Sequence, residues 1–280
     1  MNYCESLIYY SRKNKSIVCM GLDPVLEDIP IKKESVRTTI VAFYEGILNK
    51  CLQYHIYPAC VKPNYAFYAQ YGIEGVHALC DVITLFRNEG FPVILDVKRG
   101  DIGKTATAYA KEAFEFFNAD AVTLSPYLGF DSIKPFTSNY PQKGFYVLVK
   151  TSNKSSSEIQ DLVVNNEPLY ILIAKKIIEW YTPGIGAVVG ATFPQQLNNI
   201  ITVFEESGKD IPLLIPGIGT QGGDMEAIIT ILNNSKNKGL HRVNASSSIN
   251  YAYKESQYQS KKYDEAAVEA LKILNETLGY

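Results

Sequence analysis

The sequence has few of the residues that most often bind metal ions or form disulfide bonds. Of its 280 residues, only three are His and five are Cys. The histidines are scattered along the chain, which argues against a His-ligated metal and against a Ser-His or Cys-His nucleophile. The cysteines are odd in number and never spaced C-x-x-C, so we expect buried, reduced thiols and no zinc site. Any chemistry is therefore expected to depend on Asp and Lys.

The sequence also lacks a strong net charge and any long hydrophobic run. A formal charge of -2 gives no electrostatic reason to expect nucleic acid or an anionic membrane as a partner, so a small soluble ligand is favoured. No apolar run approaches the roughly 20 residues that a membrane span needs. The first sixteen residues do not have the pattern of a signal peptide. We therefore expect a cytoplasmic protein.

Short apolar runs alternate with amphipathic stretches along the whole chain, a pattern typical of β-α units in a parallel sheet. We expect eight strands, within 16–23, 56–62, 91–98, 120–127, 144–151, 185–192, 211–219 and 241–247. Eight such units and a length of 280 residues, close to the roughly 250 that are typical of such barrels, favour a (β/α)8 barrel over an open doubly wound sheet. No linker or change of composition divides the chain, so residues 1–280 are predicted to form a single domain.

Two helices and one insertion are predicted between and after these strands. Apolar residues recur at three- and four-residue spacing over 105–117 and again over 264–278, which predicts helices packed on the sheet. The Ser- and Asn-rich stretch 150–168 follows the fifth strand. It is expected to be either a solvated loop or, because loops after barrel strands build the active site, a lid or rim.

Charged residues appear where buried strands should end. Asp96, Lys98 and Asp101 lie in LDVKRGD, and Lys62 ends YPACVK. In a barrel, the C-terminal strand ends face one pocket, so the polar residues expected there are Asp23, Lys62, Asp96, Lys98 and Thr151.

Such a cluster could be a structural ion-pair network or a catalytic site. A pair at about 4 Å and an effective dielectric constant near 20 gains roughly 4 kcal/mol, which burial of both charges can cancel. Alternating Lys and Asp therefore contribute little net stability. They do keep lysines protonated in a site that also holds negative charge, which favours the catalytic interpretation.

The seventh predicted strand ends in the glycine-rich sequence PGIGTQGGD. Its glycines (Gly217, Gly219, Gly222 and Gly223) allow close backbone approach, and free amides at the next helix would favour an anion. A glycine-rich loop is often only a turn, but the loops after strands seven and eight are the usual phosphate site of this fold. A phosphorylated substrate is therefore predicted.

The set LDVKRGDIGKTA, VKPNYAFY, LVKTSN, PGIGTQGGD and GLDP resembles the orotidine 5'-monophosphate decarboxylase family in its longer, type 2 form. The resemblance covers nearly the whole chain. The D-x-K-x-x-D motif alone is shared with sugar-phosphate synthases and epimerases of the same superfamily. The full set in this order is more specific.

The resemblance implies conversion of orotidine 5'-monophosphate to uridine 5'-monophosphate with no cofactor and no metal. It implies a catalytic tetrad of Lys62, Asp96, Lys98 and Asp101. It further implies ribose contacts by Asp23 and Asn64, pyrimidine contacts by Thr151 and Ser152, and a phosphate and base contact by Gln221. In that family Asp101, Ile102 and Thr105 reach the active site of the other subunit, so a homodimer with shared sites is implied.

One position departs from the family pattern. The family typically has N-x-S-R-x-I-x-Y at the eighth strand, with the Arg on phosphate, whereas this chain has Ser247 at the Arg position. The change could be engineered, natural and compensated by a cation such as Arg242 or Lys254, or a mark of lost activity. We favour the first, because the flanking residues fit the pattern.

Two other functions stay open from the sequence. One is a different D-x-K-x-x-D barrel enzyme acting on a ketose phosphate, which would usually require a divalent metal. The other is a catalytically silent protein that binds a uridine nucleotide, for which Ser247 is the only support.

Overall fold

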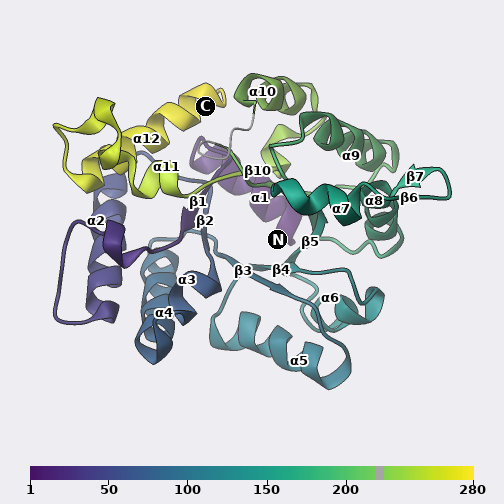
Figure 1. Ribbon diagram of the computed structural model, residues 1–280, viewed down its shortest axis with the longest axis horizontal. Coiled ribbons are helices and arrows are strands. Elements are labelled where there is room, and N and C mark those ends of the chain that lie inside the picture. The colour runs from purple at the N-terminus through teal and green to yellow at the C-terminus, as the bar shows by residue number, and fades with distance from the viewer. Residues whose placement is uncertain (219–223) are drawn as a thin grey trace.

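The computed structural model describes residues 1–218 and 224–280, and these form a ring of parallel strands surrounded by helices (Figure 1). The eight strands of the described sheet are ordered β2-β1-β10-β9-β8-β5-β4-β3. Isolated bridges from Val61 to Val93 and from Asn64 to Asp96 join the two ends of this order. The predicted (β/α)8 barrel is therefore confirmed, whereas its description as one domain stays a prediction.

Each barrel strand lies within one of the eight predicted runs or extends it by one residue. The barrel strands are β1 (Val18–Leu22), β2 (Cys60–Pro63), β3 (Ile94–Arg99), β4 (Ala121–Leu124), β5 (Gly144–Lys150), β8 (Ile185–Val189), β9 (Leu213–Ile215) and β10 (Arg242–Ala245).

Most of the longer helices lie outside the barrel. The α-helices are α1 (Tyr3–Lys13), α2 (Val36–Tyr54), α3 (Tyr65–Ala69), α4 (Gly72–Asn88), α5 (Gly103–Lys111), α6 (Lys134–Asn139), α7 (Ser157–Gln160), α8 (Leu169–Glu179), α9 (Pro194–Glu206), α10 (Met225–Asn234), α11 (Ser247–Asn250) and α12 (Tyr263–Thr277). The helix predicted over 105–117 is α5 continued by the π-helical η2 (Glu112–Phe116), and the one over 264–278 is α12. Shorter 3-10 turns are η1 (Leu26–Asp28), η3 (Phe130–Ser132), η4 (Lys154–Ser156), η5 (Lys238–Leu240), η6 (Ala252–Lys254) and η7 (Ser256–Tyr258).

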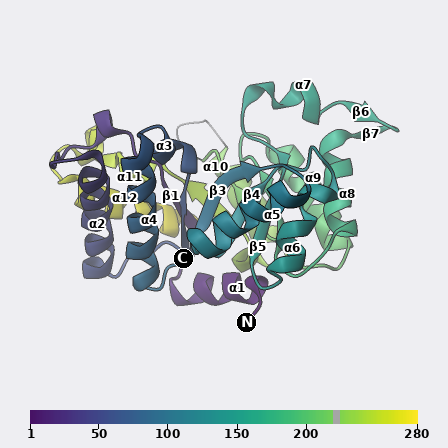
Figure 2. The same cartoon turned by 90° about the horizontal axis from the view of Figure 1, so that it is seen from below.

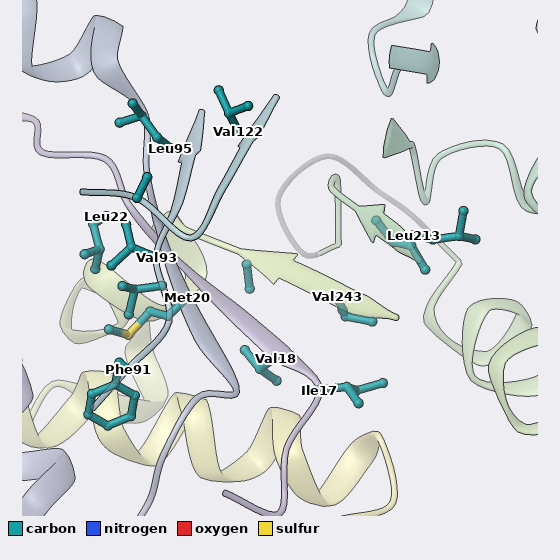
Figure 3. Close-up of a cluster of buried hydrophobic side chains, with 14 of the residues drawn as sticks. Ile17, Val18, Met20, Leu22, Phe91, Val93, Leu95, Val122, Leu213 and Val243 are labelled. Carbon is teal, nitrogen blue, oxygen red and sulfur yellow. The ribbon is translucent and has the colours of Figure 1, made fainter. Parts of the chain in front are cut away.

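Side chains alternate along each strand between two hydrophobic layers. Val18, Met20 and Leu22 of β1 belong to the larger layer between the strands and the helices, part of which Figure 3 shows. Cys19 of β1 and Tyr146 of β5 belong to a smaller cluster. That cluster takes side chains from most barrel strands and also from α1, as the filled interior of a small barrel requires.

Helix α1 closes the N-terminal end of the barrel. The Tyr3 hydroxyl donates to the Tyr146 hydroxyl at 3.2 Å, and the Arg242 guanidinium donates to the Leu7 carbonyl at 2.5 Å. In Figure 2, α1 lies below the strands, and α7 lies at the opposite side. The open end is therefore the C-terminal end, where the predicted site residues lie.

The insertion after β5 is more ordered than a simple polar loop. It contains η4, α7 and a two-stranded hairpin of β6 (Val163–Val164) and β7 (Glu167–Pro168). Asn165 and Asn166 between the hairpin strands have φ of 52° and 66°. Asn tolerates this left-handed conformation better than most residues, which is why the sequence NN can form the tight turn.

The five cysteines are all free. Four of them are buried and Cys80 is half-buried, so the expectation of burial holds for four, whereas the reduced state of the thiols stays a prediction.

Candidate active site

A buried carboxylate at the end of β3 is the centre of the candidate site. Asp96 is 7% exposed and accepts hydrogen bonds from Lys62 Nζ at 2.9 Å and from Lys98 Nζ at 2.6 Å. The Thr123 hydroxyl of β4 donates to the same carboxylate at 2.9 Å. Lys62 is also buried, whereas the Lys98 side chain is 48% exposed. Two cations therefore meet one carboxylate, and one of the cations faces the open end of the barrel.

An unusual backbone conformation directs Lys98 toward Asp96. Lys98 has φ of 48°, a region that a side chain other than Gly rarely adopts, and the pairing of β3 with β4 is irregular between Leu95 and Arg99. The amides of Val97 and Lys98 both donate to the Thr123 hydroxyl, at 3.0 and 2.9 Å. The Thr123 hydroxyl thus stabilises both the irregular backbone at Val97 and Lys98 and the position of the Asp96 carboxylate.

Sequence reasoning missed Thr123. The available signal was a hydroxyl within the otherwise apolar strand AVTL of β4. The side chain is 1% exposed, and a buried hydroxyl requires hydrogen-bond partners.

The charges of the cluster stabilise one another. Burial alone would raise the pKa of Asp96, but the adjacent Lys62 and Lys98 lower it well below the usual range. Burial likewise would lower the pKa of Lys62, but the carboxylates of Asp96 and Asp23 raise it above the usual value. Asp96 is therefore ionised and Lys62 is protonated at neutral pH. A ligand entering this site meets fixed charges of both signs.

Asp23 lies at the end of β1, beside the loop that follows β10. Its Oδ2 accepts a hydrogen bond from the Ser246 hydroxyl at 2.7 Å. Its Oδ1 is buried and has no partner among the described residues. Gly21 permits the close approach of this loop, because a Cβ at Gly21 would lie 2.6 Å from Ser246 Cβ. Asp23 therefore has one carboxylate oxygen whose hydrogen-bonding capacity is unused among the described residues.

Asn64 and Thr151 are held by local hydrogen bonds. Asn64 caps α3, and its Oδ1 accepts from the Ala66 amide at 3.2 Å. The Thr151 amide donates to Gln160 Oε1 at 2.9 Å, and Gln160 Nε2 donates to the Thr151 hydroxyl at 2.9 Å. Ser152, which follows, is half-buried.

Three predicted residues after β3 are not part of the cluster within this chain. The Asp101 carboxylate accepts from the Ile102 amide at 2.8 Å, and no ion pair joins it to either lysine of the cluster among the described residues. Ile102 is 53% exposed, and Thr105 is also exposed.

The predicted phosphate end is only partly described. Gln221 lies outside the described residues, as do Gly219, Gly222 and Gly223. Gly217 has φ of 96°, which glycine adopts without strain. Ser247 begins α11 and is exposed.

Arg242 does not compensate for the Ser at position 247. Its guanidinium donates to the carbonyls of Leu7, Gly239 and His241 at the closed end of the barrel, so this suggestion is wrong. Lys254 is different, because it lines, together with Ser247, a cavity of about 620 Å³. There it forms an ion pair with Asp28.

The described residues offer neither a metal site nor a membrane-spanning helix. Within residues 1–218 and 224–280, no group of three or more His, Cys, Asp or Glu side chains is arranged to hold a metal ion. No helix in these ranges is both long and apolar enough to cross a membrane.

Comparisons of the sequence and of the fold with known proteins all point to the same family. The sequence model of the "Orotidine 5'-phosphate decarboxylase / HUMPS family" matches residues 16–272. The chain is 41% identical over 265 residues to the orotidine 5'-phosphate decarboxylase of Cupriavidus necator, covering 92% of both proteins. Its fold matches the OMP decarboxylase of Leishmania donovani with a TM-score of 0.76 at 31% identity and full coverage of both chains. It also matches the Leishmania donovani UMP synthase with a TM-score of 0.79 at 33% identity, but spans only 56% of that longer chain.

Proposed function

Because the chain belongs to the orotidine 5'-phosphate decarboxylase family, we propose that it converts orotidine 5'-monophosphate to uridine 5'-monophosphate. This reaction is a step of de novo pyrimidine biosynthesis. The observation that carries the proposal is the buried Asp96 carboxylate, which two lysines contact at the open end of the barrel. Such an arrangement matches a reaction in which a carboxylate group leaves as carbon dioxide and the carbanion that remains must be stabilised.

The charges of the cluster suggest a role for each group. The substrate carboxylate would lie against Asp96, and this like-charge contact is relieved when carbon dioxide leaves. The Lys98 ammonium stabilises the carbanion that develops at C6 of the pyrimidine and then donates a proton to that carbon. Lys62 keeps Asp96 ionised throughout, because its ammonium is 2.9 Å from the carboxylate.

The remaining contacts follow the parts of the nucleotide. Asp23 would accept a ribose hydroxyl through its Oδ1, which is buried without a partner among the described residues. Asn64 would also contact the ribose, because it follows β2, the strand that pairs with β1. Thr151 and Ser152 would contact the pyrimidine edge. The phosphate would be bound by Gln221 and by amides after β9 and β10. Binding energy from the phosphate would then be used in the transition state.

Ser247 weakens the proposed phosphate contact but leaves the reacting groups intact. A hydroxyl cannot supply the two charged hydrogen bonds of an arginine side chain. A high KM with chemistry preserved is therefore expected. That Ser247 is an engineered substitution stays a prediction.

We propose further that two chains share their active sites. Exposed apolar side chains gather in the loops after β3 and β4, where Ile102 is 53%, Tyr127 87% and Leu128 47% exposed. Apolar surface of this kind favours a protein partner. A second copy of the chain would bring its Asp101, Ile102 and Thr105 to the cluster of the first.

Mixing two inactive variants tests the shared site. Lys62→Met and Asp101→Asn chains should each be inactive alone, and reassembled mixtures should regain about a quarter of the wild-type activity, because half of the dimers are mixed and each has one intact site. A mixture as inactive as its components would contradict shared sites.

We also propose a cytoplasmic location. The five free cysteines support it, because thiols persist in a reducing compartment.

The proposed reaction is tested by following loss of the orotate absorbance over a wide range of orotidine 5'-monophosphate concentrations, with a chelator present. We expect the wild-type protein to turn over this substrate, and we expect Lys98→Met to abolish the turnover. Binding of uridine 5'-monophosphate without turnover would favour the silent binding protein. Turnover of a ketose phosphate that the chelator stops would favour the metal-dependent barrel enzyme.

A further inference from the structure

Lys150, the last residue of β5, is a buried cation that the proposed reaction does not use. Its side chain is fully buried, and its Nζ lies 2.8 Å from Asp161 Oδ1 and 4.4 Å from the centre of the Phe193 ring. Asp161 is the only carboxylate within ion-pair distance of Lys150 in the part of the chain that the structure describes. Burying an unpaired ammonium is costly, so the position of Asp161 is strongly coupled to Lys150.

The neighbouring residues make a second, parallel contact. Thr151 follows Lys150, Gln160 precedes Asp161, and the Gln160 carboxamide bonds both the Thr151 amide and the Thr151 hydroxyl. Two consecutive residues at the end of β5 are thus paired with two consecutive residues at the end of α7. The insertion is thereby fixed to the strand end by an ion pair and a two-point hydrogen bond.

The other side of this segment is fixed by β8 and the loop that follows. The Gly190 amide donates to the Lys150 carbonyl at 2.7 Å, and the Thr192 hydroxyl donates to the Ser152 carbonyl at 2.9 Å. The packing is close, because a Cβ at Gly190 would lie 2.7 Å from Ser152 Cα. Thr151 and Ser152 therefore lie between β8 and the insertion, with little freedom to shift.

We propose that Lys150, Gln160 and Asp161 form a positioning latch that sets Thr151 and Ser152 for recognition of the pyrimidine. This inference rests on the proposed function and adds to it a group of residues that touch no reacting atom. The latch acts through the backbone of the β5 exit. Its loss should weaken recognition of the base and leave recognition of the ribose phosphate intact, because Asp23 and the phosphate-binding loops lie on other strands.

The test compares a ligand that carries the pyrimidine with one that has the same ribose phosphate but no base. Affinities for uridine 5'-monophosphate and for ribose 5-phosphate are measured by calorimetry on the full chain and its variants. Asp161→Asn removes the charge with little change of size, Asp161→Glu restores the charge, and Gln160→Met removes the second contact. Glu167→Gln is the matched control, because Glu167 lies in the same insertion and the exposed ion pair that it loses is with Lys175 of α8.

Asp161→Asn should raise the Kd for uridine 5'-monophosphate about tenfold, as expected for loss of a charged hydrogen bond, and leave the Kd for ribose 5-phosphate unchanged. Asp161→Glu should regain most of the affinity, Gln160→Met should behave like Asp161→Asn, and the control should behave as wild type. If Asp161→Asn fails to fold, as judged by circular dichroism, Gln160→Met carries the test.

Equal weakening of both ligands would show a merely structural role and overturn the latch, as would no change in either. These outcomes are distinct from a failure of the proposed function. Wild-type protein that neither binds uridine 5'-monophosphate nor consumes orotidine 5'-monophosphate would overturn that function, and the latch with it.

Discussion

Replacing Thr123 by Val tests how the site is held together. The two side chains have nearly the same shape, so the change removes one hydroxyl and leaves the packing of β4 intact. That hydroxyl donates to Asp96 and accepts from the amides of Val97 and Lys98. Thr123→Val therefore removes three hydrogen bonds at a single atom.

The magnitude follows from these contacts. Asp96 keeps its contacts with both lysines. The loss therefore comes from the hydrogen bonds of the Val97 and Lys98 amides and from the one bond to the carboxylate. We expect a loss of about 2 to 4 kcal/mol in the free energy of unfolding. At about 2 °C per kcal/mol for a chain of this size, the Tm should fall by roughly 4 to 8 °C.

Activity should fall as well, because Lys98 loses the support for its left-handed backbone conformation. A displacement of about 1 Å at a reacting group can lower the rate roughly a hundredfold, so kcat should fall by up to that factor. Thermal unfolding by circular dichroism and the orotate absorbance assay measure the two effects. Thr123→Ser, which keeps the hydroxyl, is the matched control and should retain most of both properties. A Thr123→Val protein with wild-type Tm and kcat would refute the role of Thr123 in supporting the backbone at Val97 and Lys98.

Further predictions concern charge and phosphate binding. The folded-state pKa of Asp96 lies below its unfolded value, so its contribution to stability is present above about pH 4 and is lost as the pH falls through the folded pKa. Denaturant unfolding across acidic pH should show this loss, and an equal pH dependence in Asp96→Asn would contradict it. Ser247→Arg should lower KM roughly tenfold to a hundredfold with kcat nearly unchanged. Ser248→Arg, the adjacent control, should not, and a Ser247→Arg variant with wild-type KM would remove position 247 from the phosphate site.

Much of the fold could be predicted from the sequence because its signals are local. Parallel strands buried on both faces appear as short apolar runs, and each of the eight runs contains a strand of the barrel. The charged ends of two runs likewise predicted that Lys62, Asp96 and Lys98 would meet, because parallel strands end on the same side. The structure places these three side chains in direct contact.

The parts that could not be predicted depend on contacts between distant residues. Thr123 is one polar residue in an apolar strand, and nothing in its neighbours shows that it supports Lys98. The pairing of Lys150 with Asp161 required the insertion to fold back on β5, which a Ser- and Asn-rich composition does not indicate. Arg242 is the first residue of β10, so it lies at the opposite end of the strand from Ser247, and its contact with the Leu7 carbonyl depends on the packing of α1 against the barrel.

The most direct test of the central claim is to run the reaction with orotidine 5'-monophosphate in D2O, in the presence of a chelator, and to analyse the product by proton NMR. The account predicts uridine 5'-monophosphate that carries deuterium at C6, formed in step with loss of the orotate absorbance and abolished by Lys98→Met. No product even at saturating substrate, or wild-type turnover by Lys98→Met, would contradict the assignment of Lys98 as the proton donor of a decarboxylase.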